Sequence, residues 1–365
     1  MDVALVHDYL MQGMRGAERV LAVFHELYPQ APIYTLLYDA QKMGPATADW
    51  DIRTSFLQKI PGARRLHRKL FALMPLAVER LNLSEYDLVI SSSSAWVKNV
   101  RTPPQTPHIC YCYSPARFLW HWSDEYVRSL PGGPIAHTLV RATLPALRLW
   151  DRYGTRRVTE FVAISTTVQQ RIRRYFGREA TVIHPPVDTE RFQPVGEQED
   201  YFLIVSTLNP YKHVDLAIEA FNRLQLPLLI IGQGPEYKRL KQLAGATVQL
   251  LGWRDDAEVS YRMARCRAFI MPQEEDFGIA PVEAQSCGRP VIAYGAGGAI
   301  DSIIDGQTGL LFTPQTPEAL CQAVRRFEQM DFDPEACRNN ALRFRIERFK
   351  REFSAFVERV CAQNR

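Results

Sequence analysis

The segment from Met271 to Phe312 carries the strongest chemical pattern in the chain. An apolar strand is predicted to end at Met271, and the acidic loop that follows contains Glu275. Glu283 lies about one turn into the next predicted helix. Gly278 allows a ligand to approach the backbone closely, and the N–H groups at the start of a helix attract phosphate. The two carboxylates would accept hydrogen bonds from hydroxyl groups, although a solvated acidic loop that caps a helix has the same residue types.

Apolar strand patterns alternate with helical patterns along the chain, and they place the candidate residues in loops after strands. The predicted strands are Val3–His7, Tyr86–Ser91, His108–Tyr113, Glu160–Ala163, Thr181–His184, Tyr201–Ser206, Leu228–Ile231, Thr247–Leu250, Ala268–Met271 and Pro290–Ala293. Continuous apolar strands separated by helices predict parallel sheets that are covered on both faces. Such sheets bind ligands at the carboxyl ends of their strands.

The length of 365 residues suits two domains. A segment rich in proline and charge, 184–200, is the best linker candidate because it lacks periodicity. We expect a first Rossmann-like domain over 1–186 and a second over 187–345. The remaining residues, 346–365, are predicted to form a C-terminal helix that crosses back to the first domain. Two such domains would face each other across a cleft.

The composition narrows the function. Hydrophobic residues make up 46% of the chain and charged residues 23%, which excludes wholesale disorder. A net charge of +4 is too small for a nucleic-acid-binding protein. The chain has no long apolar run and no basic segment at its start, so we expect a cytoplasmic protein. Seven cysteines without a C-x-x-C pair indicate reduced thiols, with Cys110 and Cys112 packed in a strand.

The order of motifs resembles that of the retaining glycosyltransferases of family 4. Glu275 and Glu283 match the E-x7-E motif of that family. The accompanying motifs are His7-Asp8, Gly16–Val20, Cys110–Cys112, Pro210–Lys212, Gly288–Ala293, Gly295–Gly298 and Asp305–Phe312. The set is similar to the mannosyltransferase branch that builds bacterial O-antigens and exopolysaccharides. The resemblance implies the GT-B fold, retention of anomeric configuration, no metal or other cofactor, and GDP-mannose as the donor.

The resemblance also implies the donor-binding residues. They are Gly13, Gly16, Thr207, Lys212, Gly252, Trp253, Glu275, Phe277, Gly278, Ile279, Ala280 and Glu283. Glu283 would hold the ribose hydroxyls, and Glu275 would face the donor sugar. Lys212 would stabilise the charge of the leaving diphosphate. The nucleotide base would lie against the backbone at Gly252 and Trp253, although Trp253 is equally compatible with packing in the core or at its rim.

Three positions depart from the family pattern. Thr207 stands where the family usually has an arginine, and Arg15 precedes Gly16 where two adjacent glycines are usual. Tyr113 stands where a histidine is usual. A neutral threonine cannot stabilise the developing diphosphate charge as an arginine does, so either this stabilisation is weaker or another cation supplies it. We expect Arg15 to be that cation, and a solvent-facing arginine without a role is the alternative. Lys212, Glu275, Arg15 and Tyr113 are therefore the expected catalytic residues, with Tyr113 donating a hydrogen bond to a sugar hydroxyl.

The first half of the chain is expected to face the acceptor, a glycan or a lipid-linked saccharide. His7, Asp8, Arg117 and Trp120 are the candidate acceptor-side residues. Residues 53–70 contain six basic side chains and no acidic one, interleaved with apolar residues. This pattern predicts a peripheral contact with an anionic membrane at its cytoplasmic face, and a solvated helix with an apolar inner side is the alternative.

Two other functions compete with a hexosyltransferase. One is a GT-B protein that binds a nucleotide sugar but has weak or lost transfer activity, and Thr207 and Tyr113 keep it open. The other is a GT-B sugar epimerase, which the E-x7-E arrangement disfavours. Slow consumption of a donor in water would distinguish an enzyme from a binding protein.

Overall fold

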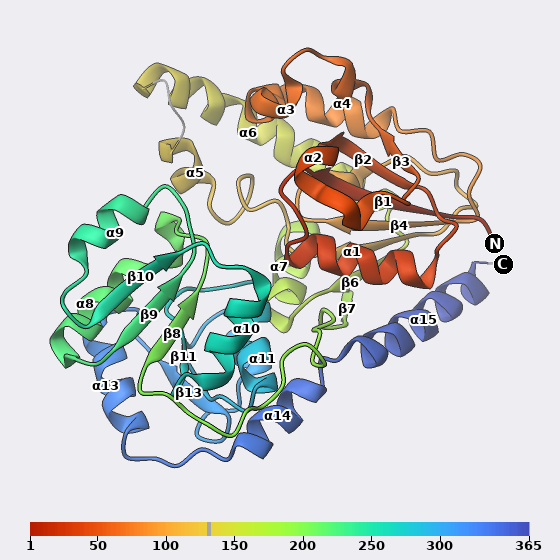
Figure 1. The fold of residues 1–365 in the computed structure, drawn as a ribbon. Coiled ribbons are helices and arrows are strands. Elements are labelled where there is room, and N and C mark those ends of the chain that lie inside the picture. The colour runs from red at the N-terminus through yellow and green to blue at the C-terminus, as the bar shows by residue number, and fades with distance from the viewer. Residues whose placement is uncertain (130–132, 365) are drawn as a thin grey trace. The chain divides into compact units, whose positions relative to one another are not determined.

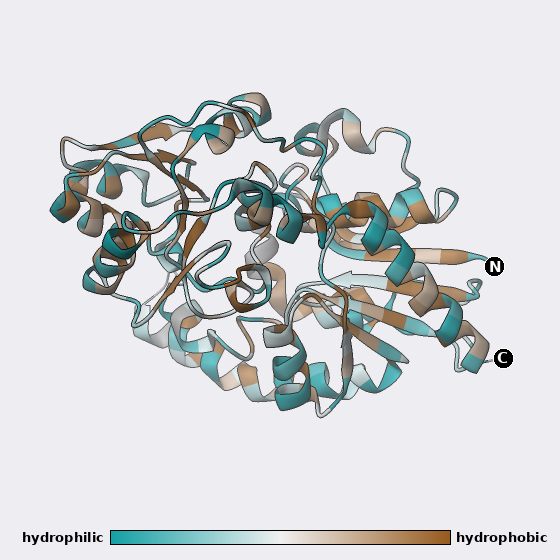
Figure 2. Ribbon diagram, turned by 90° about the horizontal axis from the view of Figure 1, so that it is seen from below, coloured by the Kyte–Doolittle hydropathy of each residue, from teal (hydrophilic) through white to brown (hydrophobic). Residues whose placement is uncertain are grey.

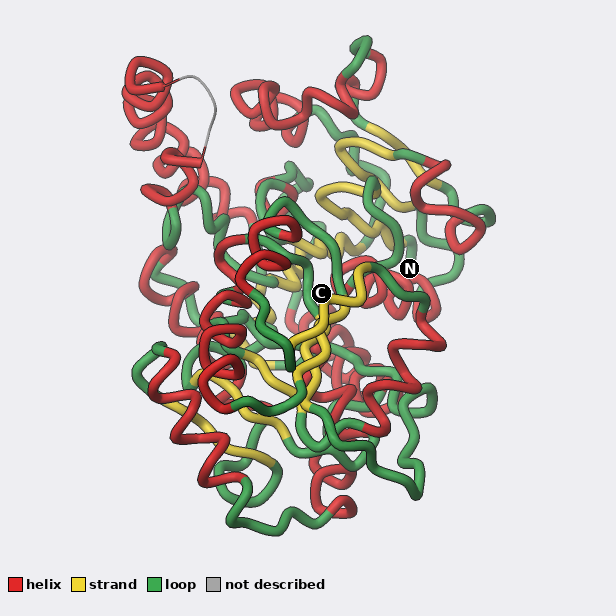
Figure 3. Tube along the Cα trace, turned by 60° about the vertical axis from the view of Figure 1, so that its left-hand side comes forward, coloured by secondary structure: helices red, strands yellow, loops and turns green. Residues whose placement is uncertain are grey.

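The chain forms two compact α/β units (Figure 1). The computed structural model describes residues 1–129 and 133–364, without the side chains of residues 66–69, 125, 129, 135 and 136. Unit 1 contains Met1–His184 together with the residues from Lys350 onward, and unit 2 contains Pro185–Phe349. In each unit the strands form one sheet between helices (Figure 3).

Unit 1 is built on a seven-stranded sheet in the order β3-β2-β1-β4-β5-β6-β7, and every neighbouring pair is parallel. The strands are β1 (Val3–Leu10), β2 (Ile33–Tyr38), β3 (Ile52–Thr54), β4 (Leu88–Ser93), β5 (His108–Cys112), β6 (Glu160–Ala163) and β7 (Ala180–Val182). The central strands β1, β4 and β5 are buried and mainly apolar (Figure 2), as parallel sheets require. They also carry buried polar residues, among them His7, Asp8 and Ser91–Ser93.

The helices of unit 1 connect these strands. They are α1 (Gly16–Leu27), α2 (Ala40–Met43), α3 (Ala63–Leu66), α4 (Met74–Glu79), α5 (Ser123–Ser129), α6 (Gly133–Gly154) and α7 (Thr166–Phe176), with 3₁₀ turns η1 (Gly44–Thr47), η2 (Phe56–Lys59), η3 (His67–Leu73), η4 (Val97–Asn99) and η5 (Thr155–Arg157). α7 shows how local sequence sets the ends of a helix. The Ser165 hydroxyl accepts a hydrogen bond from the Val168 N–H at its start, and Gly177 adopts a left-handed conformation at its end.

Unit 2 has a six-stranded sheet in the order β10-β9-β8-β11-β12-β13, and every neighbouring pair is again parallel. The strands are β8 (Phe202–Val205), β9 (Leu228–Ile231), β10 (Val248–Gly252), β11 (Phe269–Met271), β12 (Val291–Tyr294) and β13 (Gly309–Phe312). The helical elements are η6 (Pro210–Lys212), α8 (Val214–Leu224), α9 (Tyr237–Leu243), α10 (Asp256–Arg265), α11 (Ile279–Ser286), α12 (Ala299–Ser302), α13 (Pro317–Phe327) and α14 (Pro334–Leu342).

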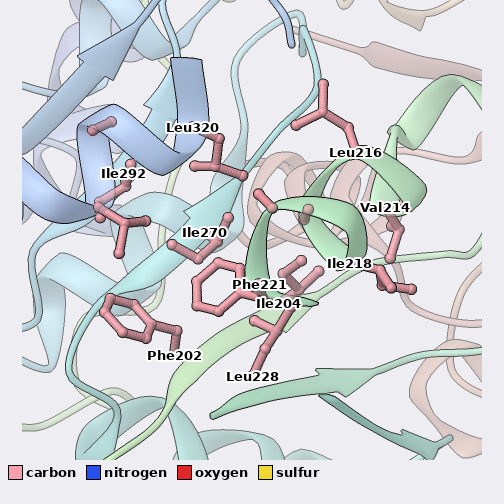
Figure 4. Close-up of a cluster of buried hydrophobic side chains, with 14 of the residues drawn as sticks. Phe202, Ile204, Val214, Leu216, Ile218, Phe221, Leu228, Ile270, Ile292 and Leu320 are labelled. Carbon is pink, nitrogen blue, oxygen red and sulfur yellow. The ribbon is translucent and has the colours of Figure 1, made fainter. Parts of the chain in front are cut away.

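Alternate residues of β8 supply the two cores of unit 2. Phe202 and Ile204 pack with Phe221 of α8 and with α13 on one face (Figure 4). Leu203 packs with α10 and α11 on the other face. This alternation follows from the two-residue period of a strand, and it buries the sheet between two helical layers.

The last helix, α15 (Ile346–Gln363), begins in unit 2 and packs within unit 1 from Lys350 onward. Phe353 contacts Phe24 of α1, with ring centroids 4.7 Å apart, and its ring lies 6.2 Å from that of Tyr111. Lys350 pairs with Glu26 at 2.6 Å. The segment after Pro185 packs in unit 2, where Phe192 is buried in the core.

The predicted fold class is confirmed, because both sheets are parallel and covered by helices. Three strands were not predicted: β2, β3 and β13. β3 has three residues at the edge of its sheet, and its largely exposed side chains show little apolar pattern. The helix α6 lies between the predicted strands His108–Tyr113 and Glu160–Ala163, where the alternation of strands and helices indicates a helix without giving its bounds.

All seven cysteines are free thiols in the described structure, and six of them are buried. Cys110 and Cys112 pack inside β5, as the alternating strand pattern indicates. Across residues 1–129 and 133–364, no helix combines the length and the apolar character that a membrane span needs.

Candidate functional site

The loops after β8 and β11 meet at the carboxyl edge of the sheet in unit 2. These strands are neighbours in the sheet, so their loops lie side by side although they are distant in sequence. Lys212 Nζ forms an ion pair with Glu275 Oε1, and the two side chains retain 14% and 16% of their exposure. The Gln273 amide donates to the same carboxylate oxygen at 3.0 Å. The Glu275 carboxylate is therefore held from two sides within reach of solvent.

The glycine-rich loop Gly295–Gly298 packs against the acidic loop that contains Glu275. The Gly298 N–H donates to the Glu275 carbonyl oxygen at 2.8 Å. A side chain at Gly297 would collide with that carbonyl, and a side chain at Gly298 would collide with the backbone of Phe277. Gly297 also has a φ of +65°, which disfavours other residues. The glycines of Gly295–Gly298 therefore serve the packing that holds Glu275.

A second pair of glycines supports the loop that leads to Lys212. Side chains at Gly232 and Gly234 would collide with the carbonyl oxygens of Ser206 and Leu208. The Leu208 N–H donates to the Gln233 carbonyl oxygen at 2.9 Å. The Gly-x-Gly segment after β9 therefore packs against protein backbone.

The helix α11 begins directly after this acidic loop. Its N-cap is Gly278, which has a φ of +85° and no side chain to cap the first N–H groups. Phe277 is buried and packs against Phe344, with ring centroids 5.4 Å apart, so the start of the helix is anchored. Glu283 lies in the next turn of α11 and is 8% exposed. The N-terminus of α11 and the Lys212–Glu275 pair thus bring partial positive charge, a cation and a carboxylate to one edge of the sheet.

Two further predicted donor residues are exposed at this edge. Thr207 is exposed, and its hydroxyl accepts a hydrogen bond from the Asn209 amide at 3.2 Å. Trp253 follows β10 and is 66% exposed, so its packing in the core is excluded. The preceding Gly252 has a φ of +75°, and its carbonyl accepts from the Gly232 N–H at 2.9 Å.

In unit 1 a chain of hydrogen bonds links His7 and Tyr113, which are predicted site residues, through Ser92. His7 Nδ1 lies 3.0 Å from Ser92 Oγ, and Ser92 Oγ lies 2.8 Å from the Tyr113 hydroxyl. The Tyr113 hydroxyl donates to the Ala17 carbonyl oxygen at 3.1 Å. Because each hydroxyl has one proton, the chain runs from the His7 Nδ1–H towards Ala17. It ties β1, β4 and the loop after β5 to the first turn of α1.

Burial sets the protonation states in this chain. Burial raises the pKa of Tyr113 far above its ordinary value and lowers the pKa of His7 below 6.5. Both side chains are therefore neutral near neutral pH. The single proton of the Tyr113 hydroxyl is already donated to Ala17, so the structure engages Tyr113 within unit 1.

Asp8 follows His7 in β1, and its carboxylate accepts hydrogen bonds from the backbone. The two oxygens accept from four backbone N–H groups, those of Ser94, Ala95, Trp96 and Val97, at distances of 2.6 to 3.0 Å. The side chain is 2% exposed. Asp8 thus fixes the turn after β4, which positions this loop.

The loop between β1 and α1 carries Arg15. Gly13 has a φ of +80°, which lets the chain turn there, and Gly16 begins α1. Arg15 is the exposed N-cap residue, and its guanidinium donates to Gln12 Oε1 at 2.9 Å. The guanidinium is thus held on the solvent side of the start of α1.

Trp120 is bonded to a buried ion pair, and Arg117 lies over another aromatic ring, that of Trp122. The Trp120 indole donates to Asp151 Oδ2 at 2.8 Å, and Asp151 pairs with Lys98 at 2.6 Å. The Arg117 guanidinium lies 4.6 Å from the ring centroid of Trp122. This part of the predicted acceptor platform is engaged in packing and in satisfying a buried charge.

The basic stretch 53–70 is divided among several elements. Arg53 in β3 is bonded to Asp51 at 2.8 Å and Arg64 pairs with Asp39 at 3.6 Å, while Leu57 is fully buried. Among its predicted members, the side chains of Leu66, Arg68 and Lys69 lie outside the described residues. In the described part, two of its cations are paired within unit 1.

Sequence reasoning did not identify Gln273 and Ser92 as parts of these arrangements. Gln273 is 6% exposed and has an amide that reaches Glu275, and Ser92 stands between His7 and Tyr113. Gln273 lies two residues before Glu275, which is the only local signal for its role. Ser92 is one of four consecutive serines, and no pattern singles it out. Within residues 1–129 and 133–364, no group of three or more His, Cys, Asp or Glu side chains is arranged to hold a metal ion.

Comparisons with known proteins match both units to glycosyltransferases. A Glycosyltransferase Family 4 model matches residues 14–191, and a Glycosyl transferases group 1 model matches residues 187–344. D-rhamnosyltransferase WbpZ of Pseudomonas aeruginosa is 30% identical over 44% of this chain and 45% of its own length. A GDP-mannose-dependent alpha-(1-6)-phosphatidylinositol monomannoside mannosyltransferase of Mycolicibacterium smegmatis is 30% identical over 44% of this chain and 50% of its own. The chain spans about half the length of the curated relatives it matches.

Solved structures share the complete architecture. HepE from Anabaena, solved in complex with UDP, superposes with a TM-score of 0.73 at 19% identity, covering 98% of this chain and 100% of HepE. Sucrose-phosphate synthase from Thermosynechococcus elongatus also has a TM-score of 0.73, at 17% identity, covering 99% of this chain and 100% of the other. At these identities the likeness shows the fold, which is the predicted one.

Proposed function

The chain belongs to the GT-B glycosyltransferases of family 4, and we propose that it transfers a hexose, with retention of configuration, from a nucleotide-diphosphate sugar to a glycan or lipid-linked acceptor. The proposed donor is GDP-mannose. The motif order supports this donor, and so does the similarity to a GDP-mannose-dependent mannosyltransferase.

The Lys212–Glu275 pair beside the N-terminus of α11 carries the proposal. A nucleotide sugar presents a diphosphate, which needs positive charge, next to hydroxyl groups, which need acceptors. The Lys212 ammonium and the helix N-terminus supply the positive charge. The Glu275 carboxylate supplies the acceptor, and its amide and lysine contacts hold it in place before a ligand arrives. Positive charge for a diphosphate and an acceptor for hydroxyl groups therefore lie at the same edge of one sheet.

Glu283 is proposed to hold the ribose hydroxyls of the donor. It lies one turn into α11, and its side chain is nearly buried. A carboxylate in that position gains from charge-assisted hydrogen bonds when a ribose covers it. The exposed Trp253 and the backbone at Gly252 are proposed to contact the base from the loop after β10.

In the proposed reaction the leaving diphosphate itself takes the proton of the acceptor hydroxyl. The new glycosidic bond forms as the bond to the diphosphate breaks, on the same face of the sugar. Lys212 and α11 stabilise the charge that develops on the leaving oxygen. Tyr113 stays a neutral phenol and transfers no proton, because burial raises its pKa.

Nucleotide binding and donor consumption test this function. Titration calorimetry with GDP, UDP and ADP is expected to show the tightest binding for GDP. GDP-mannose should be consumed slowly in water, and EDTA should change neither binding nor consumption. The proposal is wrong if none of the three nucleotides binds, and GDP-mannose is the wrong donor if UDP or ADP binds more tightly.

Binding of a nucleotide sugar without transfer is the second candidate function. It is favoured by Thr207, which places a neutral hydroxyl where an additional cation would assist transfer. Donor that binds but is never consumed, in water or with a mixture of lipid-linked saccharides, would establish this alternative. Consumption of the donor would exclude it.

A further inference from the structure

The helix α6 has an apolar inner face that packs against the rest of unit 1. Leu144 is buried with Leu119 and Val127, and Leu147 packs against the same cluster. Trp150 donates to Glu79 of α4 at 2.9 Å, so the second half of the helix is fixed to its neighbours. Its first turns extend away from the sheet of unit 1 (Figures 1 and 3).

The same helix carries a second apolar stripe on its outer side. Leu139 is 66% exposed, Leu149 is 71% exposed and Tyr153 is 56% exposed. Ala142 and Ala146 lie between them and are exposed as well. The spacings of three, four, three and four residues place all five on one side of a helix. Isolated exposed leucines are ordinary, but a continuous apolar stripe about 21 Å long indicates a contact surface.

Arginines flank this stripe, and α6 exposes no carboxylate. Arg141 and Arg152 are exposed along one side, and Arg141 pairs with Asp124 of α5 at 3.7 Å while half of its side chain stays exposed. Arg156 lies over the Tyr153 ring, 5.2 Å from its centroid. Asp151 is the one acidic residue in the sequence of α6, and it is fully buried against Lys98. The outer surface is therefore apolar along its middle and cationic along its edge. An aromatic ring at the end of such a stripe suits a boundary between apolar and polar surroundings.

We propose that the outer face of α6 docks on an anionic lipid bilayer, with the helix lying in the plane of the surface. Leu139, Leu149 and Tyr153 would enter the boundary between headgroups and acyl chains. Arg141 and Arg152 would contact lipid phosphates, and long arginine side chains can reach them while their stems stay on apolar surface. The surface is independent of the donor site, so this proposal stands apart from the proposed reaction.

The charge and the size of the stripe favour a bilayer over a second copy of the chain. Two copies related by a two-fold axis would place the same arginines of both copies in one interface. The sequence of α6 supplies no exposed carboxylate to pair with them, and Asp124 of α5 already pairs with Arg141. A stripe about 21 Å long and about 10 Å wide covers roughly 200 Å². A stable protein interface buries about 800 Å² on each partner.

The sequence analysis assigned membrane contact to residues 53–70, and we now assign it to α6. The Arg53 and Arg64 guanidinium groups are bonded to carboxylates of unit 1, and Leu57 is buried in its core. Leu57 is therefore not available to lipid, whereas Leu139 and Leu149 on the outer side of α6 are exposed. The basic groups do not distinguish the two surfaces, because Arg141 also pairs with a carboxylate, that of Asp124.

Sedimentation with lipid vesicles tests the proposal on the full chain. The protein should bind vesicles of phosphatidylcholine with 30% phosphatidylglycerol, and binding should fall at least about tenfold on pure phosphatidylcholine. The double variant Leu139→Asp/Leu149→Asp should lose at least about tenfold in affinity for the anionic vesicles. Arg141→Gln/Arg152→Gln should lose a similar amount and should reduce the dependence on salt.

Matched variants separate this surface from general effects. Ile300→Asp changes a residue of unit 2 that is 57% exposed, and it should bind vesicles like the parent. Thermal unfolding and GDP titration of every variant report on folding and on the donor site, and neither should change. An unchanged vesicle affinity of the Leu139→Asp/Leu149→Asp variant overturns the proposal. The proposal is also overturned if the parent does not bind vesicles but forms a dimer, and the Leu139→Asp/Leu149→Asp variant is a monomer. That result would assign the stripe to self-association.

Discussion

The polar motif residues at the carboxyl edges of the two sheets differ in their exposure and in their hydrogen-bond partners. At the edge of unit 2, Lys212 and Glu275 pair with each other and remain partly exposed, at 14% and 16%. At the corresponding edge of unit 1, the carboxylate of Asp8 is saturated by backbone N–H groups, and the Tyr113 hydroxyl is committed to Ser92 and Ala17. We therefore expect the motif residues of unit 2 to exchange their partners for a ligand. Those of unit 1 mainly hold the loops in place.

This contrast teaches that a sequence motif can mark either a ligand contact or a support. His7 and Tyr113 are both bonded to Ser92, and Asp8 is bonded to backbone N–H groups, so replacement of these residues should act largely through structure. The loops of Lys212 and Glu275 pack against glycines whose side-chain positions are filled by backbone, and the Lys212 and Glu275 side chains stay partly exposed. The predictions that follow test whether this division is real.

Replacing Lys212 by methionine should have the largest effect on transfer. The variant removes the cation at the site proposed for the diphosphate, and the loss of one preorganised charge costs about a hundredfold to a thousandfold in kcat/KM. Steady-state consumption of GDP-mannose measures it. Lys238→Met, at an exposed position of α9, should leave the rate unchanged. Equal rates for parent and Lys212→Met would remove Lys212 from the catalytic site.

Arg15 offers an exception to the contrast, because it is an exposed cation in unit 1. If it contacts the donor phosphates, Arg15→Gly should lower kcat/KM about tenfold to a hundredfold while the melting temperature changes little. Adding Thr207→Arg to that variant should restore a good part of the activity. Thr207→Val in the same background should restore none. Independent, additive effects of Arg15→Gly and Thr207→Arg would show that the two positions do not share a task.

Glu283→Gln tests the second carboxylate of unit 2. The change keeps the size of the side chain but removes its charge, so GDP binding should weaken by about 1–3 kcal/mol. Titration calorimetry gives this value directly. Glu274→Gln alters a neighbouring acidic residue of the preceding loop, and GDP should bind it as it binds the parent. An unchanged affinity of Glu283→Gln for GDP would show that Glu283 does not hold the ribose hydroxyls.

The buried imidazoles of unit 1 should make its stability depend on pH. Burial lowers the pKa of His108 to about 3 and also lowers that of His7. The unfolded chain takes up protons on these groups below about pH 6.5, and the folded chain does not. The free energy of unfolding should therefore fall as the pH decreases from 6.5. For His108 the slope approaches about 1.4 kcal/mol per pH unit, and His7 adds to it in the same direction.

Urea unfolding between pH 7 and pH 5 measures this slope. His108→Asn should flatten it by the share of one group, whatever the variant does to stability at pH 7. His108 Nε2 lies 2.7 Å from Ser91 Oγ, and its Nδ1 has no hydrogen-bond partner within the described residues. A slope that His108→Asn leaves unchanged would show that His108 is protonated in the folded protein.

Tyr113→Phe should have the smallest effect of the series. It removes the hydroxyl between Ser92 and Ala17, so unfolding should become easier by about 1 kcal/mol. GDP affinity should not change, because the hydroxyl lies in unit 1 and is engaged there. Chemical denaturation and calorimetry measure the two quantities. A large fall in kcat/KM with unchanged stability would restore the sugar contact that the sequence analysis assigned to Tyr113.

The sequence alone determined the fold class and the identity of the acidic loop. The strand predicted over Val3–His7 is the core of β1, and the strands predicted between residues 201 and 293 match β8 to β12 with small shifts at their ends. These features are local, because a strand's apolar run and a helix's period appear within a few consecutive residues. The motif order around Glu275 and Glu283 is local in the same sense.

Only the tertiary structure decided which polar groups meet. Lys212 and Glu275 are 63 residues apart, and they meet because crossover connections make β8 and β11 neighbours. The use of Tyr113 and Asp8 as supports, the packing role of Gly297 and the exposed outer stripe of α6 depend on the same long-range arrangement. A local pattern states which side chains a segment has, but burial and partners are set by the segments that pack against it.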